Sequence, residues 1–154
     1  MFTDLVSSTA LTQQLGDEGA QKIIASHDRV VHDALSEHGG AQIKHTGDGI
    51  MAGFESAVKA TRAARHIANS LHEQYIGVRI GLNAGEPIAQ DGDLFGTSVQ
   101  LAARVCDRAQ RGQVLATGVV RELTAGKDVT WHPEGEFEPK GFDRPVAIYA
   151  LNLT

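Results

Sequence analysis

The sequence predicts an α+β domain in which helices alternate with mostly antiparallel strand pairs and pack on one side of the sheet. Apolar residues recur at three- and four-residue steps in several segments, as in amphipathic helices, and short β-prone runs bounded by glycine lie between them. A chain of 154 residues is long enough to bury a core as one domain. We therefore treat residues 1–154 as a single domain.

Composition and charge narrow the class of protein. The chain is 42% hydrophobic and 21% charged with a net charge of -5, which is ordinary for a soluble protein and unfavourable for binding nucleic acid. Its single cysteine, Cys106, excludes an intrachain disulfide, and no apolar run is long enough to span a bilayer. We expect a cytoplasmic domain without membrane contact, and part of a longer protein because the chain opens inside its first strand.

The first elements follow from local patterns. Residues 2–6 predict a short buried strand, which leads into residues suited to cap a helix, namely Ser7, Ser8 and Thr9. The helix carries its apolar face over residues 20–35, and Gly39-Gly40 is expected to end it.

The middle of the chain predicts a hairpin, a helix and a strand pair. Residues 43–54 give two β-prone runs joined by a Gly47-Asp48-Gly49 turn. Residues 57–71 have the period of a second amphipathic helix. Residues 78–85 and 86–90 predict another pair of strands, bent by glycines.

The last third predicts a third helix over residues 96–109 and a strand over residues 113–117. A short helix over residues 117–124 follows, and residues 129–137 and 145–153 are expected to close the sheet as a hairpin.

Two carboxylates follow β-prone runs where a strand gives way to a turn. Asp4 ends the first strand and Asp48 lies in the hairpin turn, and such oxygen ligands suit Mg²⁺, which leaves its other positions to water and substrate phosphates. The helix start at Ser7, Ser8 and Thr9 offers backbone N–H groups to a phosphate. The alternative interpretation is structural, with Asp4 as a helix cap and Asp48 as one half of an Asp-Gly turn.

Two further charged residues, Lys44 and Asp93, are candidates for the same site. Lys44 lies four residues before Asp48 on what we interpret as one strand, so strand alternation predicts that both face one side of the sheet. Asp93 precedes the third helix. Their alternatives are a solvated edge lysine and a loop carboxylate.

Polar residues on the third helix and near the end of the chain are further candidates. Gln100, Arg104 and Arg108 share one helix face at four-residue steps, and Lys140 precedes Gly141 in an expected turn. A solvated polar stripe and a turn lysine are the structural alternatives.

Five segments, in this order, resemble the motifs of the class III nucleotidyl cyclase catalytic domain, the adenylate and guanylate cyclase family. The resemblance covers nearly the whole chain and rests on Phe2-Thr3-Asp4-Leu5-Val6-Ser7-Ser8-Thr9, Ile43-Lys44-His45-Thr46-Gly47-Asp48-Gly49, Arg79-Ile80-Gly81-Leu82-Asn83-Ala84-Gly85-Glu86, Leu94-Phe95-Gly96-Thr97-Ser98-Val99-Gln100-Leu101-Ala102-Ala103-Arg104 and Pro139-Lys140-Gly141-Phe142.

The resemblance implies a ferredoxin-like, mixed but mostly antiparallel sheet and an adenylate cyclase that converts ATP to 3′,5′-cyclic AMP and pyrophosphate. It implies that Asp4 and Asp48 hold two Mg²⁺ or Mn²⁺ ions and that Lys44 and Asp93 read the base. It also implies that Arg104 stabilises the transferring α-phosphate and that Gln100 orients the ribose. Lys140 would bind the β- and γ-phosphates. It also implies a head-to-tail homodimer in which the metal aspartates of one subunit meet the remaining residues of its partner.

Base chemistry favours ATP over GTP. Adenine accepts at N1 and donates at N6, so a lysine and a carboxylate match it, whereas guanine reverses that pattern. A guanylate cyclase and a regulatory module without useful turnover remain alternatives. A diguanylate cyclase is disfavoured because the turn reads Gly47-Asp48-Gly49-Ile50 instead of Gly-Gly-Asp-Glu-Phe.

One position departs from the family pattern, which has Asn where this chain has Gln100. The extra methylene moves the amide by about 1.5 Å, so we expect Gln100 to affect the rate more than binding.

Overall fold

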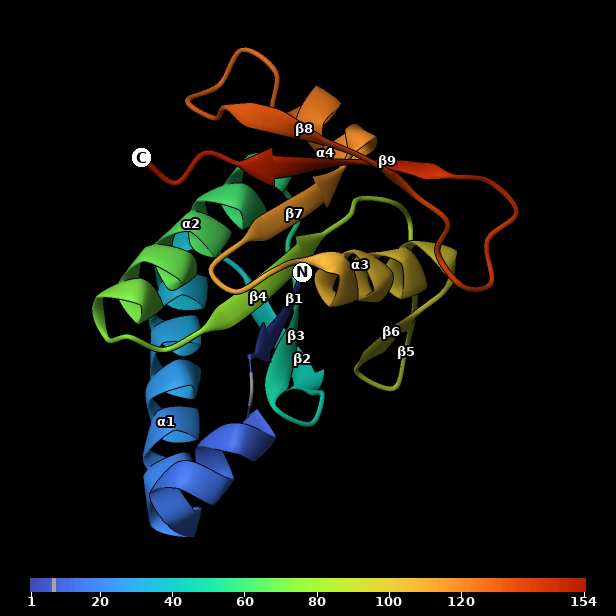
Figure 1. Cartoon of the computed structure of the whole chain (residues 1–154). Coiled ribbons are helices and arrows are strands. Elements are labelled where there is room, and N and C mark those ends of the chain that lie inside the picture. The colour runs from blue at the N-terminus through green and yellow to red at the C-terminus, as the bar shows by residue number, and fades with distance from the viewer. Residues whose placement is uncertain (7) are drawn as a thin grey trace.

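The computed structural model describes residues 1–6 and 8–154 (Figure 1). Its helices are α1 (Ser8–His38), α2 (Ala57–Glu73), α3 (Thr97–Arg108) and α4 (Gly118–Leu123). Its strands are β1 (Phe2–Leu5), β2 (Ala41–His45), β3 (Gly49–Gly53), β4 (Val78–Leu82), β5 (Ile88–Gln90), β6 (Asp93–Phe95), β7 (Val114–Thr117), β8 (Trp131–Phe137) and β9 (Val146–Leu151).

Seven strands form the central sheet in the order β2-β3-β1-β4-β7-β9-β8. Neighbouring strands are antiparallel except for the parallel pair β4 and β7. The predicted α+β class with a mostly antiparallel sheet is therefore confirmed, as are the β2–β3 and β8–β9 hairpins.

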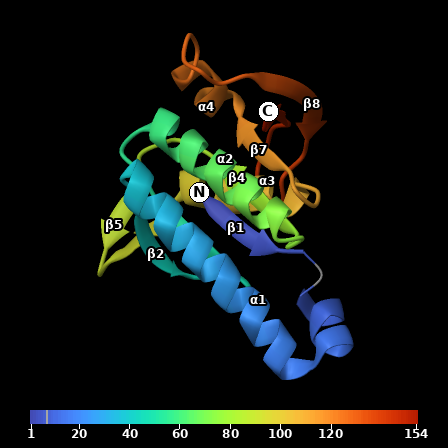
Figure 2. The ribbon, with the colours of Figure 1, turned by 90° about the vertical axis from the view of Figure 1, so that its left-hand side faces the viewer.

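Helices cover both faces of this sheet, so the expectation that they pack on one side is wrong. α1 and α2 lie on one face of the sheet (Figure 2). They bury the larger core there, with Ile67 of α2 and Ile80 of β4 completely buried. α3 packs on the other face around Val105 and Leu115. Successive side chains of a strand point to opposite faces, and β7 has apolar residues on both: Val114 and Ala116 belong to the larger core, while Leu115 faces α3. The sheet therefore requires two covering layers.

The strand pair predicted for residues 78–90 is also corrected. β4 lies in the middle of the sheet between β1 and β7, while β5 pairs with β6 as a separate two-stranded sheet. Val78, Ile80 and Leu82 are all buried, as befits a central strand, whereas β5 is exposed along its length. The sequence pattern did not reveal this, because neighbours in sequence usually pair.

The long helix α1 is bent near its start. Gly16 has non-helical angles (φ 71°, ψ 177°), and the first turns lie at an angle to the rest (Figure 2). Gly39, with φ 68°, ends α1 as predicted. Among the helices of residues 1–6 and 8–154, none has the length and apolar character that crossing a membrane requires.

Candidate functional site

The backbone brings Asp4 and Asp48 to neighbouring strand ends. Asp4 pairs in register with Gly49, and the backbone N–H of Leu5 donates to the carbonyl of Asp48 at 3.3 Å. A Cβ atom at Gly49 would lie 1.7 Å from the carbonyl oxygen of Thr3, so only glycine permits this approach. The close packing of the two strands thus requires glycine directly after Asp48.

The argument that placed Lys44 and Asp48 on one strand is wrong. β2 ends at His45, and Asp48 lies in the turn, which Thr46 closes by donating its N–H to the carbonyl of Gly49 at 3.0 Å. The register of β2 against β3 also shifts between Gln42 and Lys44. Strand alternation therefore does not relate these two side chains.

Arg79, a residue to which the sequence analysis gave no role, holds the carboxylate of Asp4. Its Nε and Nη2 donate to Asp4 Oδ2 at 2.9 and 2.7 Å, from the neighbouring strand β4. Burial works against the charge on Arg79, but the hydrogen bonds and the charge of Asp4 outweigh it, so the pKa of Arg79 lies above its ordinary value. The sequence signal was a charged residue within an otherwise apolar strand.

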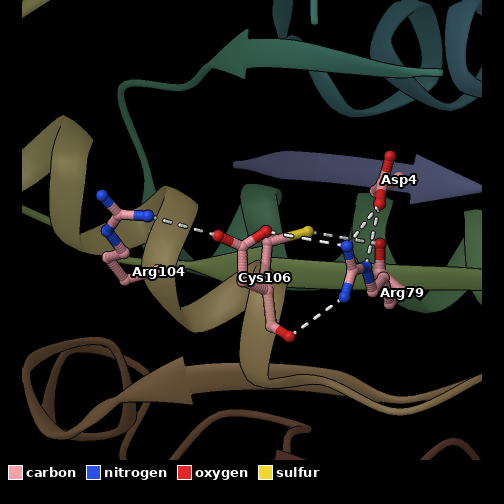
Figure 3. A network of polar contacts seen from close by, with 5 residues as sticks. Asp4, Arg79, Arg104 and Cys106 are labelled. Atoms are coloured by element: carbon pink, nitrogen blue, oxygen red, sulfur yellow. Dashed lines mark hydrogen bonds and ion pairs between the residues drawn. The ribbon is translucent and has the colours of Figure 1, made fainter. Parts of the chain in front are cut away.

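A chain of polar contacts joins this pair to α3 (Figure 3). Arg79 Nη1 donates to the backbone carbonyl of Asp107 at 3.0 Å, and Asp107 Oδ2 lies 3.7 Å from Arg104 Nη1. The thiol of Cys106 contacts the Arg79 carbonyl at 3.5 Å, and burial raises its pKa to about 12. Cys106 is therefore a buried thiol rather than a nucleophile.

Lys44 and Asp93 meet although 49 residues separate them in sequence. Lys44 Nζ donates to Asp93 Oδ2 at 2.7 Å and lies 5.8 Å from the centre of the Phe95 ring. The hydrogen bond from Lys44, together with that from the N–H of Leu94, lowers the pKa of Asp93 below its ordinary value. The structure thus pairs a cationic donor with a carboxylate acceptor at the edge strand β2.

The remaining predicted residues lie on separate elements. Gln100 and Arg104 are exposed on α3, opposite the buried Ala102 and Cys106, and Lys140 is exposed between β8 and β9. Thr9 and Asp48 line one cavity of about 270 Å³ between α1 and β1. Ser8 is the first residue of α1, and Ser7 lies outside the described residues.

A second, larger hollow of about 440 Å³ lies beside the residues proposed to read the base. Phe2, Met51, Leu94 and Val99 contribute to its largely apolar wall. Asn83 stands in the same wall, donates to the carbonyl of Ser98 at 2.9 Å and accepts from Thr117 at 2.6 Å. The sequence analysis did not foresee this hollow, because its wall comes from elements distant in sequence.

The residues present fit divalent cations at Asp4 and Asp48. Both offer carboxylate oxygens, which are the ligands of Mg²⁺ and Mn²⁺. Both contacts from Arg79 use Oδ2 of Asp4, so Oδ1 lies outside that ion pair. Asp4 can therefore ligate a cation while Arg79 still orients it.

Another group of metal-ligating side chains lies elsewhere. Glu37 and His38 at the end of α1 meet His66 of α2, with His66 Nδ1 3.2 Å from Glu37 Oε2. This group packs on the α1 and α2 face, across the sheet from Arg104. It does not belong to the candidate site.

Comparison with known proteins supports the assignment of this site to one family. The profile of the family described as the adenylate and guanylate cyclase catalytic domain matches residues 1–153. An uncharacterized protein of Mycobacterium tuberculosis is 35% identical over 153 residues, which is 98% of this chain and 40% of that protein. An adenylate cyclase of Streptomyces griseus is 30% identical over 119 residues, covering 76% of this chain and 30% of that protein.

A solved structure supports the same family assignment. The adenylate/guanylate cyclase/hydrolase from Silicibacter pomeroyi superposes with a TM-score of 0.85 at 26% identity, covering 97% of this chain and 92% of that one. The chain spans less than half the length of each of the two relatives from Mycobacterium tuberculosis and Streptomyces griseus. This chain belongs to the adenylate and guanylate cyclase family and forms its catalytic domain.

Proposed function

We propose that this domain is an adenylate cyclase that converts ATP to 3′,5′-cyclic AMP and pyrophosphate. The observation that supports ATP is the contact of 2.7 Å between Lys44 Nζ and Asp93 Oδ2. The two groups form a donor and an acceptor side by side, which matches N1 and N6 of adenine. A guanine in their place leaves polar groups unpaired at a cost of about 1–3 kcal/mol each.

The side chains of Lys44 and Asp93 are both accessible to a nucleotide base. The lysine side chain is 47% exposed and the aspartate 25% exposed, so both can turn toward a base at the rim. Leu94, next to Asp93, opens onto the apolar hollow and offers a surface for the flat face of adenine.

Asp4 and Asp48 hold the two divalent cations, which supply activation of the ribose 3′-hydroxyl and neutralise charge on the polyphosphate. Arg104 places its planar, permanently charged fork against the oxygens of the α-phosphate as charge builds there. Lys140 binds the β- and γ-phosphates, and Thr9 with Ser7 and Ser8 presents the start of α1 to the triphosphate. Gln100 orients the ribose.

We further propose that two copies share each site. Among the described residues of one chain, Arg104 is linked to Asp4 through Asp107 and Arg79, while Lys44 contacts Asp93. Isologous pairing of two copies would bring Arg104, Lys44 and Asp93 of each copy to the metal aspartates of the other, which gives two identical sites. Ile88 and Phe95, 65% and 47% exposed on the β5–β6 pair, give such a contact an apolar surface. The buried Cys106 fits a reducing, cytoplasmic setting.

Cyclase activity is tested directly with Mn-ATP and Mn-GTP by chromatographic detection of the cyclic nucleotides. We expect cyclic AMP from the natural chain and none from Asp48→Ala. Asp128→Ala, which removes an exposed carboxylate outside the candidate site, is the matched control. Product no higher than that of Asp48→Ala would refute the enzyme and favour the regulatory module, for which Gln100 is the supporting feature. Cyclic GMP product in excess of cyclic AMP would favour the guanylate cyclase.

The shared site is tested by complementation. An Asp4→Ala, Asp48→Ala chain and an Arg104→Ala chain should each be inactive, and mixing them should restore part of the activity because each supplies what the other lacks. The formation of mixed dimers is followed with two different affinity tags. Mixed dimers that stay inactive would show that one chain supplies the whole site.

Base reading is tested with Lys44→Glu combined with Asp93→Asn. We expect the preference for ATP over GTP, measured as a ratio of kcat/KM, to fall by about tenfold, as the loss of one matched hydrogen bond to a base predicts. The single variant Lys127→Gln makes the same net charge change, a loss of one positive charge, at an exposed position and serves as the control. An unchanged ratio in the double variant would disprove the assignment of Lys44 and Asp93.

A further inference from the structure

His27 is a polar residue at the centre of an apolar helix face. Its exposure is 0%, and Val31 and Ala34 on the same face of α1 are equally buried. A buried imidazole must satisfy both ring nitrogens. Nε2 lies 3.0 Å from Thr3 Oγ1 and Nδ1 lies 2.9 Å from Asp28 Oδ1, so both nitrogens have partners.

The chemistry of the partners sets the direction of each hydrogen bond. The carboxylate of Asp28 only accepts, so Nδ1 carries the proton, and Nε2 of the neutral ring accepts from the hydroxyl of Thr3. Thr3 Oγ1 in turn accepts from the N–H of Ile50 at 3.0 Å. Every donor in this line meets an acceptor. Burial lowers the pKa of His27, which favours the same neutral ring.

This line of hydrogen bonds reaches the strands that carry the proposed site. Thr3 and Ile50 are register partners, and Thr3 directly precedes Asp4, while Ile50 follows Asp48 by two residues. On the other side, Asp28 Oδ2 lies 4.0 Å from His45 Nδ1, next to Lys44. One turn of α1 therefore contacts β1 through Thr3 and β2 through His45, and it reaches Ile50 of β3 through Thr3.

We propose that His27 is a positioning residue for the metal site: through Thr3 and Ile50 it fixes β1 against β3 and so sets how the carboxylates of Asp4 and Asp48 converge. The proposal rests on the proposed function, because it assumes that these two carboxylates bind the cations. Metal ligation depends on small displacements, and partners that orient the ligands from behind contribute about tenfold to a hundredfold in affinity or activity.

The test compares hydroxyl-deleting and hydroxyl-keeping variants. Thr3→Val keeps the shape and removes the link, Thr3→Ser restores it, and His27→Leu removes it from the other side. Mn²⁺ binding is measured by electron paramagnetic resonance with a non-reactive ATP analogue, beside melting temperature and the Mn²⁺ concentration for half-maximal activity. We expect Thr3→Val and His27→Leu to weaken Mn²⁺ binding by about tenfold and Thr3→Ser to stay near the natural chain.

Thr61→Val supplies the matched control. Thr61 is also 0% exposed in the same core and donates only to the carbonyl of Ala57 within α2, at 2.8 Å. Its loss should lower the melting temperature and leave Mn²⁺ binding unchanged. Because Thr3 and His27 act as one unit, the Thr3→Val, His27→Leu double variant should bind Mn²⁺ about as weakly as either single variant.

The outcomes separate this inference from the proposed function. If the natural chain binds Mn²⁺ without forming cyclic AMP, the proposed activity fails, and Mn²⁺ binding still decides the role of His27. If Thr3→Val and His27→Leu only melt earlier, as Thr61→Val does, the positioning role is refuted while the cyclase stands. A natural chain that binds no Mn²⁺ with the analogue overturns both.

Discussion

The two faces of the central sheet differ in kind. On the face covered by α1 and α2, large side chains such as Ile67, Leu71 and Ile80 are completely buried. On the face covered by α3, the polar line from Asp4 through Arg79 to Asp107 remains about one-third to one-half exposed. The first face stabilises the fold, while the second keeps charged groups at the rim where a ligand can reach them.

The difference shows how one sheet can both stabilise the fold and present charged groups to a ligand. Alternation along β1 sends Thr3 into the packed face and Asp4 into the polar face, and β4 does the same with Ile80 and Arg79. The polar residues therefore stand on strands whose other side is held by the main core. Changes on the two faces should separate activity from stability.

The largest effect is expected from Asp4→Asn on the polar face. We expect cyclase activity to fall by about a hundredfold to a thousandfold, because a neutral amide is a poor ligand for a divalent cation. The ion pair with Arg79 is partly exposed, so its loss should lower the free energy of unfolding by only about 1 kcal/mol. Activity is followed by cyclic AMP formation and stability by urea unfolding. Equal losses in both measurements would contradict the separation.

Ile67→Ala on the packed face should reverse this pattern. Ile67 is completely buried, and truncation of such a residue lowers the free energy of unfolding by about 2–5 kcal/mol. The cyclase activity per folded molecule should change little. Val119→Ala, at a residue 43% exposed, is the control and should leave the stability nearly unchanged. A specific loss of activity in folded Ile67→Ala would show that the faces are coupled.

Gly81→Ala tests where the two faces meet. A Cβ atom at Gly81 would lie 2.3 Å from the backbone N of Cys106, so α3 has to move away from β4. We expect a loss of about 1–3 kcal/mol in stability together with reduced activity, since α3 carries Arg104. Gly126→Ala is less suitable as a control because of its φ of 72°, whereas Ala125→Gly changes a comparable methyl group at the surface. Full activity in Gly81→Ala would show that the position of α3 matters little.

The smallest effect concerns pH. The pKa of His27 is lowered from 6.5, with burial as the largest cause, opposed by the hydrogen bond and charge of Asp28 and the charge of Asp4, while His45 adds to the lowering. Above 6.5 both folded and unfolded chains hold a neutral ring, and stability is highest; below 6.5 the unfolded chain takes up a proton that the folded chain resists. The melting temperature should therefore fall from about pH 6.5 downward.

In His27→Gln this fall should be shallower. It should not vanish, because burial also lowers the pKa of His38. Melting curves from about pH 8 to about pH 5.5 provide the comparison. An unchanged slope in His27→Gln would show that His27 does not govern it.

The sequence predicted most helices and the two hairpins because the signal for each lies within a short stretch of neighbouring residues. Gly39 with its positive φ ends α1, and the Gly47-Asp48 turn joins β2 to β3, as the pattern indicated. The exposed stripe of Gln100 and Arg104 on α3 was equally readable from its period.

The contacts between charged side chains were harder to predict from the sequence. Lys44 and Asp93 were both proposed to contact the base, yet their mutual contact depends on how β6 approaches β2. Arg79 has no local signal that names Asp4 as its partner, because the two residues are 75 positions apart. The pairing of β5 with β6 escaped prediction for a different reason, because residues 86–90 were expected to pair with residues 78–85, the strand before them.

Sequence by itself determined the fold class, most of the elements and the family motifs, since periodicity, turn residues and motif order are properties of neighbouring positions. Only the tertiary structure decided which face each helix covers, that Arg79 holds Asp4, and that His27 connects α1 to Thr3 behind it. These contacts join distant segments, and their geometry depends on the packing of the whole sheet, which no local pattern encodes.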